Sequence, residues 1–97
     1  MKNIVINAIL RAKEGKEEAL FQVMKSIVPL SRAEQGCIQY TLHVHDTDPR
    51  TFVFYEIWEH EEALEAHIQS EHYLKYRKQI EGIVEKRDVF KLRVWKA

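Results

Sequence analysis

Cysteine, glycine and proline are scarce in this sequence. Its 97 residues include one cysteine, three glycines and two prolines. The single cysteine, Cys37, can form neither an internal disulfide nor a cysteine-rich metal site, which fits a reducing compartment. The chain also lacks a glycine-rich phosphate loop, a dinucleotide-binding fingerprint and a nucleophile elbow. We therefore expect no nucleotide, flavin or other cofactor.

Neither sign of charge is in excess. The 15 basic and 15 acidic side chains give a formal net charge of zero at pH 7, so the chain lacks the basic surplus that favours nucleic acid or an anionic membrane surface. No apolar run has the length of a signal peptide or the roughly 20 residues that span a bilayer. We therefore predict a soluble, cytoplasmic protein that binds neither nucleic acid nor membrane.

The length and the hydrophobic periodicity together predict the fold. A chain of 97 residues suffices for one compact domain, which we expect to cover residues 1–97. Alternating apolar residues predict strands over 4–11, 37–45, 51–59 and 89–95. Steps of three and four predict a helix over about 16–32 and, after Trp58, a helical region divided at Ser70, whose second part carries Tyr73, Tyr76, Ile80 and Val84. This order, βαββαβ, is typical of the ferredoxin-like α+β fold.

The helices of this fold cover one face of the sheet, yet two strands carry large apolar residues on both faces. Val53, Tyr55 and Ile57 alternate with the row that holds Trp58, and residues 4–10 are apolar on both sides. Left in water, these residues would form a larger apolar patch than most monomers expose. We predict a homodimer packed sheet to sheet. The alternative is that they are scattered surface residues of a monomer.

One carboxylate and one imidazole occur where apolar residues are expected. Glu56 lies in the same strand row as Phe54 and Trp58, and His67 lies on the apolar stripe of the following helix. These side chains could line one cavity, in which an imidazole or the Tyr76 hydroxyl would pair with Glu56. Apolar walls would suit an aromatic ligand and would raise the pKa of Glu56 or lower that of His67. The alternatives are a buried hydrogen-bond anchor at Glu56 and a satisfied core histidine at His67.

The other histidines give weaker signals. His43 and His45 stand two residues apart on the polar side of a strand and could share a metal ion. No acidic residue has the matching spacing, so we interpret them as solvated or dimer-edge residues and expect no metal. His60 is expected to begin a helix. His72 either reaches the same interior as His67 or caps a helix end.

Several motifs carry a family resemblance that spans nearly the whole chain. They are EQGCIQY at 34–40, FYEIWE at 54–59, ALEAH at 63–67 and SEH at 70–72. With these motifs the chain resembles the antibiotic biosynthesis monooxygenase family, and the run from Glu56 to Tyr76 resembles its bacterial quinol monooxygenase branch. Members of this family are dimeric α+β barrels with a hydrophobic cavity between sheet and helices. Many of them oxygenate quinol-like or polyphenolic substrates without metal or flavin.

The resemblance implies a role for each candidate residue. His67 is expected to act as base or proton relay, Trp58 as a stacking wall and Glu56 as an orienting partner. His72 and Tyr76 are expected to form hydrogen bonds, although His72 and Glu56 also remain candidates for the base. The further residues expected to bind substrate are Asn7, Tyr40 and Phe54. The implied substrates are a small aromatic molecule and molecular oxygen.

Other relatives with this fold imply other functions. Haem-degrading relatives have an asparagine in the first strand, which Asn7 matches, but they have tryptophan and histidine where this chain has His67 and Arg77. An isomerase of a phosphorylated quorum-sensing signal would need a basic side chain, such as Arg77 or Lys75, in the cavity. A non-catalytic dimeric module that binds a small aromatic ligand is the third alternative. Haem degradation is the least favoured of the three.

Overall fold

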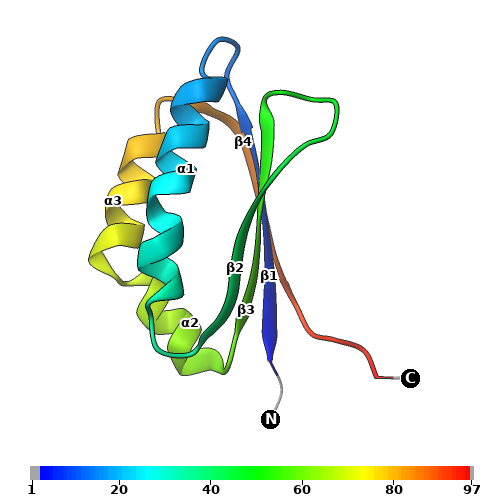
Figure 1. Ribbon diagram of the computed structural model, residues 1–97, viewed down its shortest axis with the longest axis vertical. Coiled ribbons are helices and arrows are strands. Elements are labelled where there is room, and N and C mark those ends of the chain that lie inside the picture. Colours follow the sequence, from blue (N-terminus) through cyan, green and yellow to red (C-terminus); the bar gives the residue numbers. More distant parts are fainter. Residues whose placement is uncertain (1–2, 97) are drawn as a thin grey trace.

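The computed structural model describes residues 3–96 and has three helices on one face of a four-stranded sheet (Figure 1). The elements are β1 (Ile4–Ala12), α1 (Glu17–Arg32), β2 (Cys37–Val44), β3 (Thr51–Trp58), α2 (Glu61–Ile68), α3 (Glu71–Ile80) and β4 (Val84–Leu92). The strand order is β2-β3-β1-β4, and every neighbouring pair is antiparallel. The predicted ferredoxin-like βαββαβ fold is confirmed.

Local sequence signals explain where the helices begin. Glu17 and Glu18 occupy the first turn of α1, where acidic side chains interact favourably with the helix dipole. The His60 ring accepts a hydrogen bond from the Ala63 backbone N–H at the start of α2. The Ser70 hydroxyl does the same for Tyr73 at the start of α3. The predicted Ser70 cap and helix-start role of His60 are both confirmed.

The core lies between the helices and the inner face of the sheet. Its largest fully buried side chains are Trp58, Tyr40, Tyr76 and Phe54, and Leu20, Met24 and Ile27 of α1 pack over them from one helix stripe. In β3 the residues alternate between buried and half-buried along the whole strand. The inner row of β3 therefore places Glu56 and Trp58 beneath the helices, as the alternation predicted.

Two predicted strands differ in detail from the structure. The last strand spans Val84–Leu92, not 89–95, and Val84 belongs to it rather than to α3, which ends at Ile80. Residues 84–88 are mostly charged and show no apolar alternation, but their backbone pairs with the end of β1. In β2 an irregularity between Cys37 and Gln39 turns Ile38 outward, where it is 51% exposed instead of sharing the row of Tyr40.

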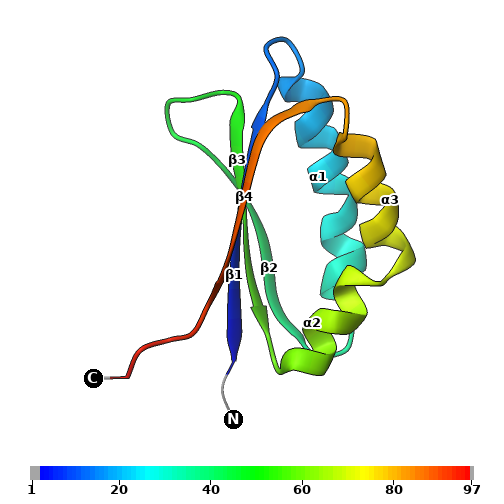
Figure 2. The same ribbon diagram turned by 180° about the vertical axis from the view of Figure 1, so that it is seen from behind.

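The outer face of the sheet carries no helix, as the view from behind also shows (Figure 2). Val53, Tyr55 and Ile57 lie on this face and are half-buried, and Phe90 and Leu92 of β4 are exposed. The predicted apolar outer face is therefore present. No helix within residues 3–96 is long and apolar enough to cross a membrane.

Gly36 allows the turn after α1 to approach α2. Its backbone φ is +87°, a value that residues other than glycine rarely adopt. A Cβ added there would lie 2.5 Å from the Cβ of Ala63. Gly15 has a similar φ, +82°, but open space around it. A substitution at Gly15 therefore tests the backbone conformation alone, whereas the same substitution at Gly36 tests the backbone conformation and close packing together.

We expect Gly15→Ala to lower the free energy of unfolding by about 1 to 2 kcal/mol, the cost of the left-handed conformation alone. Gly36→Ala should lower it by about 2 to 5 kcal/mol, because overpacking against Ala63 is added. Urea denaturation of both variants measures the difference. Equal losses would show that α2 moves away from Gly36 without cost.

Candidate active site

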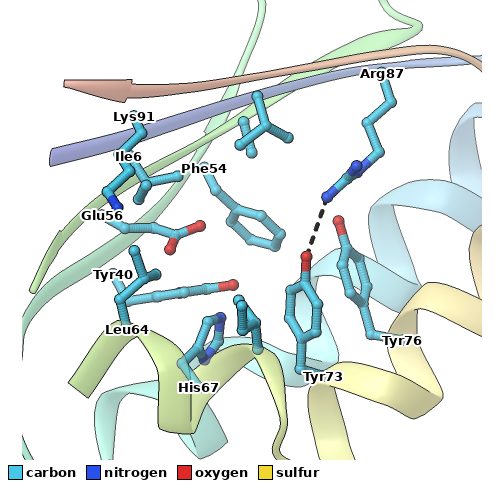
Figure 3. Close-up of a pocket in the computed structure, with 13 residues that line it drawn as sticks. Ile6, Tyr40, Phe54, Glu56, Leu64, His67, Tyr73, Tyr76, Arg87 and Lys91 are labelled. Atoms are coloured by element: carbon cyan, nitrogen blue, oxygen red, sulfur yellow. Dashed lines mark hydrogen bonds between the residues drawn. The ribbon is translucent and has the colours of Figure 1, made fainter. Parts of the chain in front are cut away.

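A cavity of about 200 Å³ lies between the inner face of the sheet and helices α2 and α3 (Figure 3). Its apolar lining consists of Ile6, Ala8, Phe54, Leu64, Ile68 and Val89, and its polar lining consists of Tyr40, Glu56, His67, Tyr73, Tyr76, Arg87 and Lys91. All four strands contribute, so the cavity crosses the width of the sheet. Its walls combine aromatic rings with a few polar groups, as is usual for small-molecule sites.

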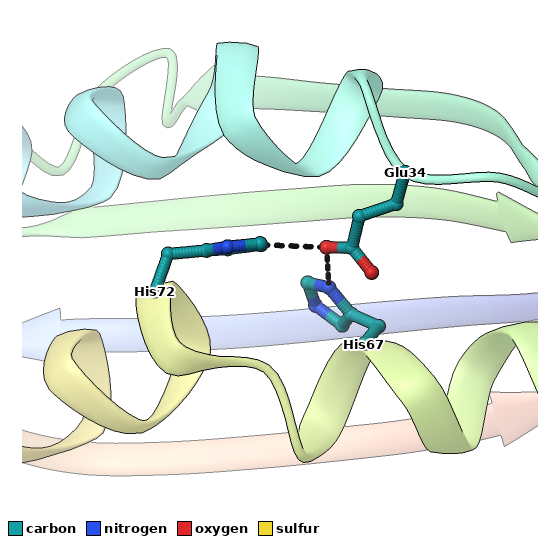
Figure 4. Close-up of side chains that lie close together, drawn as sticks. All are labelled: Glu34, His67 and His72. Carbon is teal, nitrogen blue, oxygen red and sulfur yellow. Dashed lines mark hydrogen bonds and ion pairs between the residues drawn. The ribbon is translucent and has the colours of Figure 1, made fainter.

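His67 is one of the two most buried residues of the polar lining, with 1% of its surface exposed, as is the case for Tyr40. Its Nδ1 lies 2.7 Å from Oε2 of Glu34 (Figure 4). A carboxylate only accepts hydrogen bonds, so Nδ1 carries the proton and Nε2 carries the lone pair. Nε2 is buried and has no hydrogen-bond partner among the described residues. Burial lowers the pKa of His67, and the hydrogen bond to Glu34 opposes that shift.

The turn that contains Gly36 brings Glu34 to His67. The carbonyl of Glu34 accepts the N–H of Cys37, which closes the turn, and the carbonyl of Gly36 accepts the N–H of Glu59. His72 of α3 then approaches the same carboxylate oxygen, with Nε2 2.6 Å from Oε2 of Glu34. One oxygen therefore holds two imidazoles, which come from two different helices.

This trio has the geometry of hydrogen bonds rather than of metal ligation. One atom of each residue lies within 4.8 Å of the others, a set that could in principle hold an ion. Around a tetrahedral zinc, however, ligand atoms about 2.0 Å from the metal are about 3.3 Å apart. The two nitrogen–oxygen distances here, 2.7 and 2.6 Å, are those of charge-assisted hydrogen bonds.

The ring of His67 is fixed by aromatic neighbours as well as by Glu34. Its centroid lies 4.6 Å from the Trp58 ring, 4.9 Å from the Tyr73 ring and 5.4 Å from the Tyr40 ring. Packing on several sides leaves the imidazole little rotational freedom. Its orientation is therefore set before any ligand enters.

Glu56 is held by Trp58 rather than by an imidazole. The indole Nε1–H of Trp58 donates to Oε1 of Glu56 over 2.9 Å, inside the core. Burial raises the pKa of Glu56 to about 7, while the Trp58 hydrogen bond acts in the opposite direction. Glu56 therefore exchanges a proton near neutrality at the cavity wall.

The opposite end of the polar lining is formed by Tyr73, Tyr76 and Arg87. A guanidinium nitrogen of Arg87 donates to the Tyr73 hydroxyl over 3.1 Å. Tyr76 is buried beside them, and burial raises the pKa of its phenol. Figure 3 shows both tyrosine hydroxyls pointing toward the Arg87 side chain.

The structure brings together most, but not all, of the residues predicted from the sequence. His67, Glu56, Tyr76, Phe54 and Tyr40 line the cavity. The other three predicted residues lie outside this lining. Trp58 is fully buried behind Glu56 and His67, His72 reaches Glu34, and Asn7 alternates with Ile6 and Ala8 and so lies on the outer face of the sheet.

The sequence analysis did not assign Glu34, Tyr73, Arg87 or Lys91 to the site. Glu34 belongs to the EQG motif that carried the family resemblance, so a signal for it was present. Arg87 and Lys91 belong to β4, and Arg87 precedes the predicted start of that strand. The basic residues named as candidates, Lys75 and Arg77, are exposed on α3 and do not line the cavity.

The paired histidines of β2 form no site of this kind. His43 and His45 are both exposed, and Nδ1 of His45 accepts the backbone N–H groups of Thr47 and Asp48 in the loop after β2. His43 lies against Tyr55 on the outer face of the sheet. Their interpretation as solvated or edge residues agrees with this exposure.

The raised pKa of Glu56 predicts a pH-dependent stability. Between the ordinary glutamate pKa of 4.5 and about 7, the folded chain holds a proton that the unfolded chain has lost. The free energy of unfolding therefore falls as pH rises through this window, by up to about 3 kcal/mol from this group. Glu56→Gln does not titrate and keeps an acceptor for Trp58.

We expect the stability of Glu56→Gln relative to the wild type to increase by about this amount between pH 4.5 and 8. Denaturant unfolding of both proteins across the range measures it. Groups common to both proteins, including His67, largely cancel in the difference. Parallel stability curves would show that folding leaves the pKa of Glu56 at its ordinary value.

Comparison with known proteins places this site in a family. The family described as antibiotic biosynthesis monooxygenase matches residues 3–79. YcnE of Bacillus subtilis, whose name provisionally describes it as a monooxygenase, is 36% identical over 70 residues, which are 72% of this chain and 74% of YcnE. An uncharacterised protein of Synechocystis, sll1783, is 29% identical over 73 residues, and the match spans 75% of this chain but only half the length of that relative.

Solved structures are similar to this chain over a greater length. The crystal structure of PA3566 from Pseudomonas aeruginosa is 31% identical, covers 99% of this chain and 97% of its own, and superposes with a TM-score of 0.95. SO0527 from Shewanella oneidensis is 33% identical, covers 96% of this chain and 91% of its own, and has a TM-score of 0.92. With these overlaps and the family match over residues 3–79, the chain belongs to the antibiotic biosynthesis monooxygenase family.

Proposed function

We propose that this protein is a cofactor-free monooxygenase of the quinol monooxygenase branch, acting on a quinol or related phenol inside the cavity. One observation carries the proposal. The buried imidazole of His67 faces an apolar cavity with its Nε2 unpartnered, while its Nδ1 is held by the Glu34 carboxylate. This is the arrangement of an oriented general base, in which a carboxylate sets the tautomer and stabilises the imidazolium that forms.

The chemistry relies on the substrate for electrons. His67 removes a phenolic proton, and the resulting anion transfers one electron to oxygen, giving a substrate radical and superoxide. Their combination forms a carbon–oxygen bond and, after protonation, a hydroperoxide. The protonation returns the proton that His67 removed, and loss of water then gives the oxygenated quinone, so one oxygen atom enters the product and the other leaves as water. For a simple quinol, QH₂ plus O₂ gives a hydroxyquinone and water.

The rest of the cavity suits this reaction. Its apolar walls exclude water, which protects the radical pair and the anion from side reactions. Glu56 and the tyrosine hydroxyls provide hydrogen-bonding groups around the aromatic rings of the lining. Trp58 contributes from behind, because it stacks on His67 and binds Glu56 without lining the cavity.

His67→Gln should reduce turnover at least tenfold, because an amide cannot accept the phenolic proton. Oxygen uptake with a panel of reduced quinones measures this effect, with each assay run both without and with EDTA. His45→Ala, at an exposed histidine in the loop after β2, is the matched control and should leave turnover unchanged.

Unchanged uptake in His67→Gln would remove this residue from the mechanism. Tight binding of the reduced quinones without oxygen uptake by the wild type would instead identify a non-catalytic binding module. Activity that EDTA abolishes and Zn²⁺ restores would contradict the cofactor-free mechanism. The three outcomes are distinguishable within one set of measurements.

We also propose that the active form is a homodimer packed through the outer face of the sheet. Val53, Tyr55 and Ile57 remain only half-buried there, and exposed Phe90 and Leu92 extend the apolar surface onto β4. Burial of several such side chains, at about 1.5 to 3 kcal/mol each, offsets the entropy of association. The same face on a second copy is the self-complementary partner of a two-fold interface.

Ile57→Lys should shift the protein from the mass of two chains to that of one, because it would place an ammonium group within the apolar surface that the proposed dimer buries. Sedimentation or light scattering measures the mass at several concentrations. Leu30→Lys is the matched control, since Leu30 is 51% exposed on α1 and lies away from the sheet face. A wild type that is monomeric at all concentrations would refute the dimer.

A further inference from the structure

The cavity contains a cation, the guanidinium of Arg87, which interacts with the Glu56 carboxyl only from beyond ion-pair distance. Arg87 lines the cavity from β4, and the one hydrogen bond that its side chain forms within the described residues is the contact with the Tyr73 hydroxyl. Its Nε is buried and has no hydrogen-bond partner within residues 3–96. No carboxylate of the described chain forms an ion pair with it. A buried guanidinium N–H without an acceptor is costly and is rarely left so in a folded protein.

The other cation of the lining is already paired. Nζ of Lys91 lies 2.6 Å from Oε2 of Glu61, at a site where both side chains are almost half-exposed. Arg87 therefore differs from Lys91 in having both burial and unused donors. For a ligand that enters the cavity, Arg87 is the lining cation that has no ion-pair partner among the described residues.

The surroundings of Arg87 favour a planar anion. The Tyr73 hydroxyl accepts from Arg87, so its own proton is available to a second acceptor. Figure 3 shows the Tyr76 hydroxyl on the same side of the cavity. A guanidinium binds a carboxylate through two parallel hydrogen bonds, a geometry that a fixed fork of donors fits well.

The position of Arg87 separates it from the proposed base. His67 projects from α2, whereas Arg87 projects from β4 on the side of Tyr73 and Tyr76 (Figure 3). A ligand could thus present a phenolic hydroxyl to His67 and an anionic substituent to Arg87. The cavity volume of about 200 Å³ is somewhat larger than the 150 Å³ that holds benzene in an engineered cavity, which favours one or two rings.

We propose that the substrate is a one- or two-ring phenol that carries a carboxylate, and that Arg87 is the residue that selects for this carboxylate. This inference rests on the proposed function for the phenolic part of the ligand. The carboxylate itself follows from the unpaired guanidinium and the two tyrosine hydroxyls. Arg87 is in this view a specificity-determining residue and takes no part in proton removal.

The test compares two probes that are stable to oxygen, 6-hydroxy-2-naphthoate and 2-naphthol, which differ only in a carboxylate on the ring opposite the hydroxyl. Calorimetric titration of the wild type should show at least tenfold tighter binding of the hydroxynaphthoate. Arg87→Gln should abolish this preference and leave the affinity for 2-naphthol within about threefold. Arg77→Gln, at an exposed arginine of α3, is the matched control and should behave as the wild type.

Other outcomes would overturn the proposal. Equal binding of both probes by the wild type would show that the cavity does not select a carboxylate. A loss of affinity for both probes in Arg87→Gln, with Arg87→Lys restoring neither, would assign Arg87 a packing role through Tyr73. Stronger competition by inorganic phosphate than by benzoate would indicate a phosphorylated ligand instead.

Binding and turnover give independent answers. The naphthoate preference is measured without any reaction, so it can hold even if oxygen uptake fails. Conversely, turnover of uncharged quinols with no naphthoate preference would support the oxygenase and refute the role of Arg87.

Discussion

The hydrogen bond between Glu34 and His67 is the interaction on which the proposed site depends. It crosses 33 positions of the chain and joins the turn after α1 to α2. The carboxylate accepts from Nδ1, so the lone pair of the imidazole lies at Nε2, on the other side of the ring. Without this partner, a histidine that is 1% exposed could adopt either tautomer, and the cavity would have no defined proton acceptor.

Several features of the fold serve this one contact. Gly36 allows the turn to lie against Ala63, and no residue with a Cβ fits there without displacement. His72, placed at the beginning of α3 by the Ser70 cap, holds the same carboxylate oxygen from the opposite helix. The family motifs at 34–40 and 70–72 thus meet in space at Glu34. This contact connects two motifs that lie far apart in the sequence.

The polar side chains of the cavity form two groups with different chemical properties. Burial lowers the pKa of His67 and raises that of Glu56 to about 7, and each side chain is held by one partner from outside the cavity, Glu34 and Trp58 respectively. Tyr73 and Arg87 form a separate donor group on the side of β4. Between them the lining is aliphatic or aromatic, so an aromatic ligand can be bound by dispersion and oriented by its substituents.

Local pattern determined much of this protein. The alternation of β3 placed Glu56 on the buried face, the helical spacing of α2 turned His67 inward, and Ser70 marked the beginning of α3, because each depends on residues close together in the chain. Tertiary structure alone decided that Glu34 binds His67, that Trp58 lies behind the cavity, and that Arg87 enters it. Periodicity reports the face on which a side chain lies, whereas these contacts depend on which distant elements meet. The charged start of β4 shows most clearly where prediction from hydrophobic periodicity fails. Residues 84–88 have no apolar pattern and form a strand because they pair with β1.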